Sequence, residues 1–281
     1  MEHKIAIVTD STCDLDLESI KEQGIHVVPL RVVYKDREFK DRVEISPEQV
    51  YESLGTEIPK TSMPSPGEVR ELFLKLQEQG FTHAISIHIS SGLSGTFSVV
   101  TQIAKEIQGM RIEVIDSKAL SMGLGFPVLE AVNAVKANLS FEEVIHRVQS
   151  VVERIKVFFV VSTLEYLKQG GRIGYVSATL GEILQLKPII SINEEGKYFT
   201  YSKVRGRKQS LTRLFELVQE QIKDKMVNVA VLQGAAYEEC MELVQKFRSV
   251  KNIKELVSKQ IGPSMVVHTG PGLVGVAFYE V

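Results

Sequence analysis

The sequence predicts an α/β protein with two parts: an N-terminal open, mostly parallel sheet with flanking helices, and a C-terminal α+β domain with a mixed or antiparallel sheet. In the first half, short β-branched runs alternate with amphipathic helical patterns, as in successive βαβ units. After residue 155 the strand-like runs lie closer together. The length of 281 residues also matches about two domains of roughly 150 residues. We therefore expect an N-terminal domain over residues 1–155 and a C-terminal domain over residues 156–281.

Four runs in the first half have the composition of strands that share one parallel sheet. These strands are expected at residues 4–9, 25–33, 82–89 and 112–115. Apolar side chains at helical spacing predict helices at residues 15–23, 66–79, 97–107, 119–137 and 141–155. Right-handed crossovers between successive strands would place these helices on the faces of the sheet.

In the second half, the tetrad NEEG at residues 193–196 separates two strand-like runs. Its turn-forming residues predict a hairpin, and therefore an antiparallel pair of strands. Strands are expected at residues 157–161, 188–192, 198–204, 228–232, 253–257 and 274–281. Helices are expected at residues 210–222 and 238–247.

Composition and charge disfavour several classes of protein. Apolar residues make up 44% of the chain and charged residues 24%, which is typical of a soluble globular protein with a sizeable core. A net charge of -2 gives no field that would attract nucleic acid, so no such partner is expected. Cys13 and Cys240 lack metal-ligand spacing, and we expect neither a disulfide nor a metal site. No signal peptide and no apolar run of about 18 residues stands out, which favours a cytoplasmic protein that does not span a membrane.

The strongest local signal is the segment SSGLSGT at residues 90–96, between a predicted strand and a predicted helix. Small residues at the carboxyl end of a parallel strand let a ligand approach the backbone, and the following helix offers free N–H groups to an anion. Ser91 and Ser94 would add hydroxyl donors. The alternative is a plain helix N-cap with glycines for tight packing. Two serines and two glycines together favour a binding site.

A second loop, KTSMPSP at residues 60–66, precedes a helix of the same sheet. Ser65 as N-cap and Pro66 at the first helical position account for the end of this loop. They do not account for Thr61 and Ser62. We expect these two hydroxyls in the same crevice as the serine-rich segment.

His268 lies in the glycine-rich segment GPSMVVHTGPG at residues 262–272. A lone histidine is more often structural than functional, but glycines around it let a ligand come close. Gly270, Gly272 and Gly275 also have the spacing of a dinucleotide fingerprint. We reject that interpretation, because the fingerprint needs a following helix and only one strand remains.

Arg172 lies between glycines in the segment GGRIG at residues 170–174. One interpretation is a surface turn with a solvated charge. The other is an arginine that clamps a carboxylate or a phosphate, and the sequence leaves both open.

The sequence lacks the motifs of several enzyme classes. No phosphate loop, kinase signature set or H-E-x-x-H motif occurs, so ATP use by these routes and zinc proteolysis lose support. A serine-dependent acyl hydrolase using Ser94 and His268 stays open as an alternative, although Thr96 replaces the last glycine of a nucleophile elbow. A module that binds a small anion on the serine-rich loop is a third hypothesis.

Taken together, five segments resemble the DegV family in their order and spacing. They are VTDS at residues 8–11, KTSMPS at 60–65, SSGLSGT at 90–96, GGRIG at 170–174 and HTGPG at 268–272. The resemblance covers almost the whole chain, as a single DegV-type unit over residues 3–280. Met63 stands where the family more often has glutamine.

This resemblance implies a function in bacterial lipid metabolism. Members of the family bind long-chain fatty acids such as palmitate, and the characterised ones are the fatty-acid-binding subunit of a bacterial fatty acid kinase. The chain would bind its ligand in a buried interdomain site and present it for phosphorylation to acyl phosphate. ATP and metal would belong to the kinase catalytic subunit, so this chain would be a lipid-binding protein without a cofactor or catalytic residues of its own. Transient contact with a membrane surface would accompany this lipid transport.

The resemblance also implies which residues bind the fatty acid. Hydroxyl groups would hold the carboxylate, with a histidine and an arginine as polar support. The residues expected at the carboxylate are Thr61, Ser62, Ser94, Gly95, Arg172 and His268, with Ser91 as an alternative to Ser94. An acyl chain needs an apolar cavity beyond such donors. The residues expected to line this tunnel are Leu164, Leu167, Ile173, Leu180, Ile183, Leu184 and Ile189.

Overall fold

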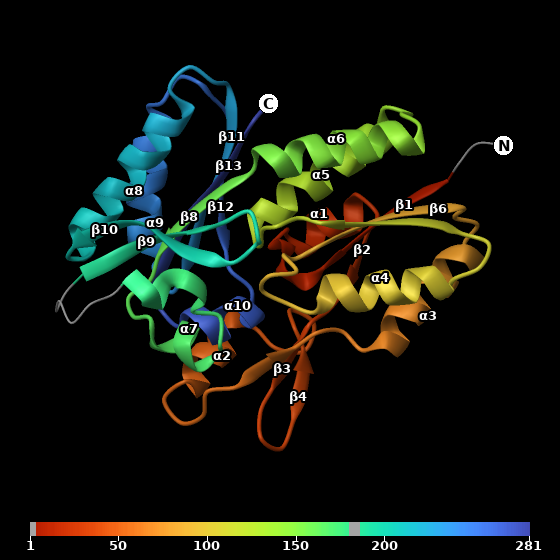
Figure 1. Cartoon of the computed structure of the whole chain (residues 1–281), viewed down its shortest axis with the longest axis horizontal. Coiled ribbons are helices and arrows are strands. Elements are labelled where there is room, and N and C mark those ends of the chain that lie inside the picture. The colour runs from red at the N-terminus through yellow and green to blue at the C-terminus, as the bar shows by residue number, and fades with distance from the viewer. Residues whose placement is uncertain (1–3, 180–185) are drawn as a thin grey trace.

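The computed structural model describes residues 4–179 and 186–281, and its N-terminal sheet lies to the right in Figure 1. Four strands form this sheet in the order β2-β1-β6-β7, and every neighbouring pair is parallel. The strands are β1 (Ile5–Asp10), β2 (Ile25–Val28), β6 (His83–His88) and β7 (Arg111–Asp116). The predicted parallel sheet of four strands is confirmed.

Helices cover both faces of this sheet. They are α1 (Leu17–Glu22), α3 (Pro66–Glu78), α4 (Thr96–Glu106), α5 (Met122–Lys136) and α6 (Phe141–Arg154). Because side chains alternate along a strand, Ala6 and Val8 face the core under α3 and α4, whereas Ile7 faces α5 and α6. Figure 1 shows these two pairs of helices below and above the sheet.

A small antiparallel sheet was not expected from the sequence. The run at residues 25–33 was predicted as one strand, but it is divided at Pro29 into β2 and β3 (Arg31–Val33). Proline lacks the N–H group that a continuous strand would use. Strand β3 pairs with β4 (Glu38–Lys40) on one side and with β5 (Lys60–Ser62) on the other, and α2 (Pro47–Ser53) lies between β4 and β5 in the chain. The loop that carries Thr61 and Ser62 is therefore a paired strand.

The C-terminal sheet has six strands in the order β10-β9-β8-β13-β11-β12. They are β8 (Lys156–Val160), β9 (Leu186–Ile192), β10 (Tyr198–Arg205), β11 (Val227–Gly234), β12 (Ile253–Gln260) and β13 (Leu273–Glu280). Only β11 and β12 pair in parallel, so the sheet is mixed, and the hairpin predicted around residues 193–196 joins β9 to β10. Helices α8 (Arg207–Ile222) and α9 (Tyr237–Arg248) cover its outer face.

Short helices complete the fold near the junction of the two sheets. They are η1 (Ser11–Cys13), α7 (Glu165–Gln169), η2 (Gly174–Thr179) and α10 (Pro263–Thr269). The glycine-rich segment at residues 262–272 was not predicted to be helical, but Pro263 begins a helix there because its fixed φ suits the first turn. Helix α10 packs against α2, α7 and β5.

The inner face of the C-terminal sheet packs on the N-terminal part. One apolar cluster includes Ile87 and Phe126 from the first part and Phe159 and Leu273 from the second. The boundary expected near residue 155 falls between α6 and β8, and the division into two domains stays a prediction. Among the described helices, none is both long enough and apolar enough to cross a bilayer.

Candidate functional site

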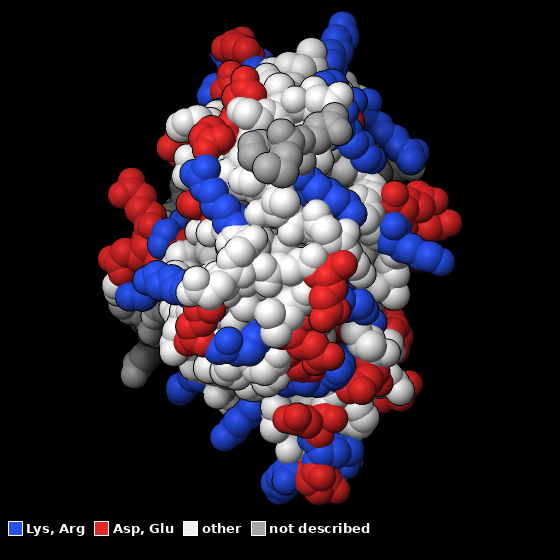
Figure 2. Space-filling view, turned by 90° about the vertical axis from the view of Figure 1, so that its right-hand side faces the viewer, with Lys and Arg blue, Asp and Glu red and all other residues white. Residues whose placement is uncertain are grey.

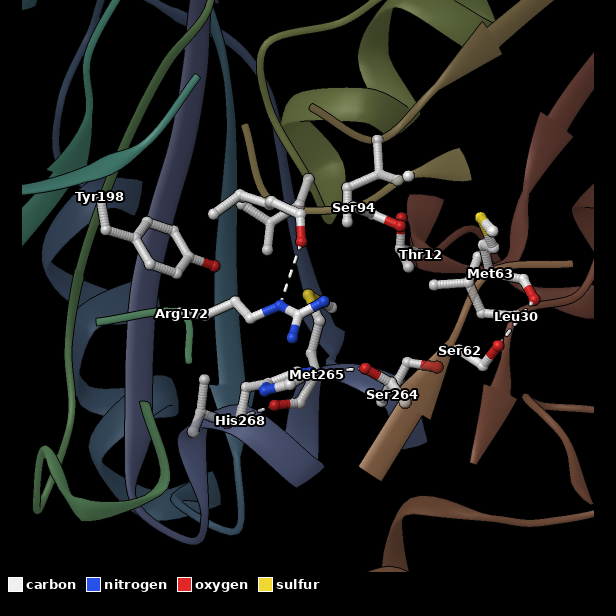
Figure 3. A pocket seen from close by; sticks show the side chains of 16 residues that line it. Thr12, Leu30, Ser62, Met63, Ser94, Arg172, Tyr198, Ser264, Met265 and His268 are labelled. Carbon is white, nitrogen blue, oxygen red and sulfur yellow. Dashed lines mark hydrogen bonds between the residues drawn. The ribbon is translucent and has the colours of Figure 1, made fainter. Parts of the chain in front are cut away.

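A cavity of about 360 Å³ lies where the two sheets and α10 meet. Figure 3 shows Arg172 and Tyr198 on one side of it and Thr12 and Ser94 on the other. Six residues singled out by the sequence line this cavity: Thr61, Ser62, Ser94, Gly95, Arg172 and His268. They come from four separate segments of the chain, so the fold brings together what the sequence keeps apart.

His268 and Thr61 form the polar contact between the two parts of the site. Strand β5 fixes Thr61 by pairing it with Val32, and α10 carries His268 in its last turn. Thr61 Oγ1 lies 2.7 Å from His268 Nε2. Burial, and to a lesser degree Arg172, lowers the pKa of His268 to about 4. The imidazole is therefore neutral at pH 7.

Arg172 is held by backbone carbonyl groups. Its Nε donates to Leu93 O at 3.1 Å, which Figure 3 marks, and its Nη1 donates to Gly170 O at 2.7 Å. Leu93 belongs to the serine-rich loop of the N-terminal sheet, whereas Gly170 ends α7. Since the guanidinium bridges the two parts of the protein, it presents a fixed positive charge to the cavity.

The three serines of residues 90–94 have different environments. Ser94 lines the cavity, and its Oγ lies 2.9 Å from Thr96 Oγ1 at the start of α4. Ser91 lies outside the cavity lining, where its N–H donates to Asp116 at 3.1 Å and its Oγ accepts from Lys118 at 3.3 Å. Between the two alternatives that the sequence left open, the structure places Ser94 at the cavity.

Ser90 anchors the loop to the β9–β10 turn. Its Oγ donates to Gly196 O at 2.8 Å. A Cβ added to Gly196 would lie 2.0 Å from Ser90 Oγ, and one added to Gly92 would lie 2.5 Å from Gly196 O. The two glycines therefore allow the C-terminal hairpin to touch the serine-rich loop, a contact that the sequence analysis did not find.

The cavity continues into a mostly apolar space. Leu120, Tyr198, Met265 and Thr269 line both the cavity and a narrow extension of about 20 Å³ behind it. The other residues lining this extension are Ser121, Val157, Phe159, Leu232, Ile261 and Leu273. The cavity thus has a polar wall, which includes Thr61, Ser94 and Arg172, and continues into a mostly apolar extension.

The structure describes four of the seven residues expected to line an acyl tunnel, and none of these four lines this space. Leu164, Leu167, Ile173 and Ile189 contact neither the cavity nor its extension. Ile189 belongs to the core under α8, because it is Ile190 on the alternate face of β9 that points inward. The other expected tunnel residues, Leu180, Ile183 and Leu184, lie outside the described residues.

Four polar residues at the cavity were missed by the sequence analysis: Thr12, Tyr198, Ser264 and Thr269. Thr12 Oγ1 donates to Asp10 Oδ1 at 2.6 Å, so its proton is already used within the protein. The segment VTDS at residues 8–11, directly before Thr12, is the part of the sequence that could have indicated this residue. Tyr198 has no signal of its own, because only the pairing of β9 with β10 turns it inward.

The contacts do not support the acyl hydrolase alternative. Ser94 Oγ pairs with Thr96, and His268 Nε2 pairs with Thr61 instead of with a serine. In the described part of the chain, His268 Nδ1 has no hydrogen-bond partner, so no acidic group orients the ring.

A hydroxyl–imidazole–carboxylate chain does occur elsewhere. Ser86 Oγ lies 2.7 Å from His88 Nε2, and His88 Nδ1 lies 3.0 Å from Asp10 Oδ2. All three residues are fully buried in the N-terminal sheet and line none of the cavities described above. This hydrogen-bonded triad is therefore part of the core, where its three polar side chains pair with one another.

Within residues 4–179 and 186–281, no three His, Cys, Asp or Glu side chains are grouped so as to hold a metal ion.

Charge on the molecular surface gives no second site on the face seen in Figure 2. Acidic and basic side chains alternate there over the N-terminal part, around a band of uncharged residues. Nucleic-acid binding usually requires a basic stripe or patch. The described residues of this face form none.

Fold and site together define an α/β protein with a ligand-sized cavity at the junction of its two sheets. The family profile described as "Uncharacterised protein, DegV family" matches residues 4–281. The chain belongs to the DegV family. Two DegV domain-containing proteins of Clostridium acetobutylicum are 44% and 42% identical to it over 99% of each chain.

Solved structures of relatives share the whole fold. A DegV family protein from Thermus thermophilus, whose description is of fatty acid binding, superposes with a TM-score of 0.93 at 31% identity and covers 99% of this chain and 100% of its own. DegV from Bacillus subtilis, described as a fatty acid binding protein, gives 0.91 at 28% identity over 99% and 100%. A stearic acid-binding protein from Eubacterium ventriosum gives 0.89 at 27% identity over 98% of each chain.

Proposed function

We propose that this chain binds a long-chain fatty acid in the cavity, with the carboxylate at the polar wall and the acyl chain in the apolar interior. One observation carries the proposal: hydroxyls and an arginine line a cavity that continues into a mostly apolar extension. The fatty acid ligands of the similar structures support it.

At the head group, the donors would be Thr61, Ser94 and Arg172, assisted by the N-terminus of α4 that begins beside Gly95. His268 supports them through Thr61. Ser62 Oγ already contacts Met63 O at 3.3 Å on the exposed side of β5, so we assign it to the rim.

At the tail, apolar burial would supply most of the affinity. Roughly 14 methylene groups at about 0.8 kcal/mol each give on the order of 11 kcal/mol before entropic and desolvation costs. A volume of about 360 Å³ is in the range of ligand pockets and would stay mostly empty around a small anion. The fatty acid proposal therefore explains the cavity better than the small-anion hypothesis does.

For the cellular role, we propose that the chain presents its fatty acid to a separate kinase that holds ATP and metal. A carboxylate oxygen would form a bond to the γ-phosphorus of ATP, the bond to the bridging oxygen would break, and ADP would leave. Thr61 and Ser94 would orient the carboxylate, and Arg172 would offset the charge that develops.

Native mass spectrometry of the purified protein, followed by organic extraction, tests the binding proposal. The expected result is a mass excess of a few hundred daltons that extracts as fatty acid. A ligand-free mass that stays unchanged after incubation with palmitate and with oleate would refute it. Incorporation of phosphate from ATP into the bound acid, in the presence of a fatty acid kinase subunit, tests the presenting role separately.

A further inference from the structure

The imidazole of His268 is confined between Thr61 and Gly170. On one side, Nε2 lies 2.7 Å from Thr61 Oγ1. On the other side, Nδ1 lies so close to the end of α7 that a Cβ added to Gly170 would be 2.1 Å from it. Nδ1 is buried and has no hydrogen-bond partner among the described residues. The ring therefore makes one side-chain hydrogen bond and one close contact with the backbone.

These surroundings decide which nitrogen carries the ring proton. A proton on Nδ1 would be a buried donor without an acceptor, and it would point at the backbone of Gly170. An unprotonated Nδ1 also lacks a hydrogen-bond partner, but it places no hydrogen atom against this backbone. Burial and Arg172 lower the pKa of His268 to about 4, so the ring has a single N–H at pH 7. That N–H is then on Nε2, facing Thr61.

We propose that Gly170 fixes His268 as the Nε2–H tautomer, and that His268 is a positioning residue which donates to Thr61 and so directs the Thr61 hydroxyl proton into the cavity. This inference rests on the proposed function, since it assigns that proton to the carboxylate of the fatty acid. It also means that His268 itself does not contact the carboxylate.

The direction of this hydrogen bond sets the polarity of the site. A threonine hydroxyl has one proton and two lone pairs. When Nε2–H donates to Thr61, the hydroxyl keeps its proton for the ligand. In the other tautomer, Thr61 would donate to Nε2 and would present only lone pairs to a carboxylate, which repel it. The cavity can therefore attract an anion through Thr61 only when Nδ1 carries no proton.

The tautomer can be measured without any ligand, by ¹⁵N NMR of histidine-labelled protein at pH 7, with His268→Gln to assign the signals. We expect a protonated Nε2 and an unprotonated Nδ1. Gly170→Ala should change both signals, because its Cβ would overlap Nδ1. Gly55→Ala is the matched control, since a Cβ at Gly55 has no atom within 4 Å, and it should change neither. A protonated Nδ1 in the wild-type protein would overturn the proposal.

A double-mutant cycle tests whether His268 acts through Thr61, with palmitate affinity as the readout. His268→Asn, which cannot reach Thr61, should weaken palmitate binding about tenfold. In the Thr61→Val background the same substitution should weaken it less than about twofold. His268→Gln, whose amide N–H can replace Nε2–H, should stay within about threefold of the wild type.

Two results would contradict the proposal even if palmitate binds normally. Additive losses in the cycle would mean that His268 contacts the carboxylate directly. Equal losses for His268→Asn and His268→Gln would mean that the Nε2–H donor has no role. Failure of the proposed function looks different, because then the wild-type protein would not bind palmitate at all, while the NMR measurement would still report the tautomer.

Discussion

At the scale of single residues, the site combines one fixed charge with neutral donors. Arg172 is the only lysine or arginine among the described residues that line the cavity. His268 is neutral at pH 7 because burial lowers its pKa to about 4. Charge attraction for a carboxylate therefore comes from Arg172, while hydroxyl groups such as Thr61 and Ser94 supply directed hydrogen bonds.

The lowered pKa of His268 predicts how stability depends on pH. The unfolded chain takes up this proton near pH 6.5, whereas the folded protein takes it up only near pH 4. Protonation of His268 therefore favours the unfolded chain as the pH falls from 6.5 to 4. It lowers the free energy of unfolding by about 3 kcal/mol in total over this range and has no effect on it above pH 6.5. In urea unfolding at several pH values, the free energy of unfolding of the wild type relative to His268→Gln should fall by this amount between pH 6.5 and 4, because the titration of Asp14 and Asp41 is common to both proteins. Identical pH profiles for the two proteins would contradict it.

Ser94 and Ser91 form a matched pair of substitutions within one loop. Ser94→Ala should weaken fatty acid binding at least about tenfold, because it removes a donor to a charged group. Ser91→Ala should leave the affinity unchanged, since Ser91 lies outside the cavity lining. Titration with a fluorescent fatty acid measures both, and chemical denaturation checks that the two variants stay folded. Equal effects of the two substitutions would remove Ser94 from the site.

At the scale of elements, short contacts between distant segments position the site. Helix α10 packs against β5 and so sets His268 beside Thr61. The β9–β10 turn touches the serine-rich loop through Ser90 and Gly196. Each half of the site is therefore held in place by an element from the other half of the chain.

Gly196→Ala should weaken fatty acid binding, although Gly196 does not itself line the cavity. Gly196 has a φ of +76°, and a Cβ there would lie 2.0 Å from Ser90 Oγ. Gly24→Ala is a matched control, since Gly24 has a φ of +65° but no atom within 4 Å of its added Cβ. Both substitutions should lower the free energy of unfolding by about 1–2 kcal/mol through backbone strain. Only Gly196→Ala should also weaken fatty acid binding, and a loss of affinity in both would refute the positioning role.

At the scale of the whole molecule, two buried carboxylates join the N-terminal part to α10. Asp14 accepts from the N–H of Gly262 at 2.9 Å, and Asp41 accepts from the N–H of Ser264 at 3.0 Å. Burial raises the pKa of Asp14 to about 7 and that of Asp41 to about 6, although Arg42 partly offsets this at Asp14. The helix that carries His268 is therefore attached at its first turn to the opposite half of the protein.

The apolar extension lies where the cores of both halves meet, so its size should set the acyl chain that fits. Leu273→Phe adds volume beside the extension of about 20 Å³ and should shift the bound lipid toward shorter chains. Leu256→Phe makes the same change beside the core under α9 and should leave the length of the bound acyl chain unchanged. Mass spectrometry of the extracted lipids compares the two variants. An unchanged chain length in Leu273→Phe would mean that the tail takes another path.

The sequence predicted the regular elements well, and its local motifs named most of the polar wall. Strands and helices of ordinary length have hydrophobic periods that can be read from neighbouring residues, as for α3, α4 and the four parallel strands. The elements that it did not predict, such as β4, β5 and α10, are too short or too rich in glycine and proline to show a period. Thr61, Ser62, Ser94 and Gly95 were found because small, hydroxyl-bearing segments precede predicted helices, and Arg172 and His268 were found because glycines surround them.

Tertiary structure alone decided which side chains meet in the cavity. Ile190 faces inward and Ile189 faces outward because strand pairing fixes the alternation of β9, and no local pattern specifies that choice. Thr61 and His268 are 207 residues apart, so their hydrogen bond depends on how α10 packs on β5. The sequence by itself determined the family, the parallel sheet and the donor groups, because these depend on local composition and spacing. Packing of the two sheets decided the depth of the cavity, the path of its apolar end and the partner of each donor.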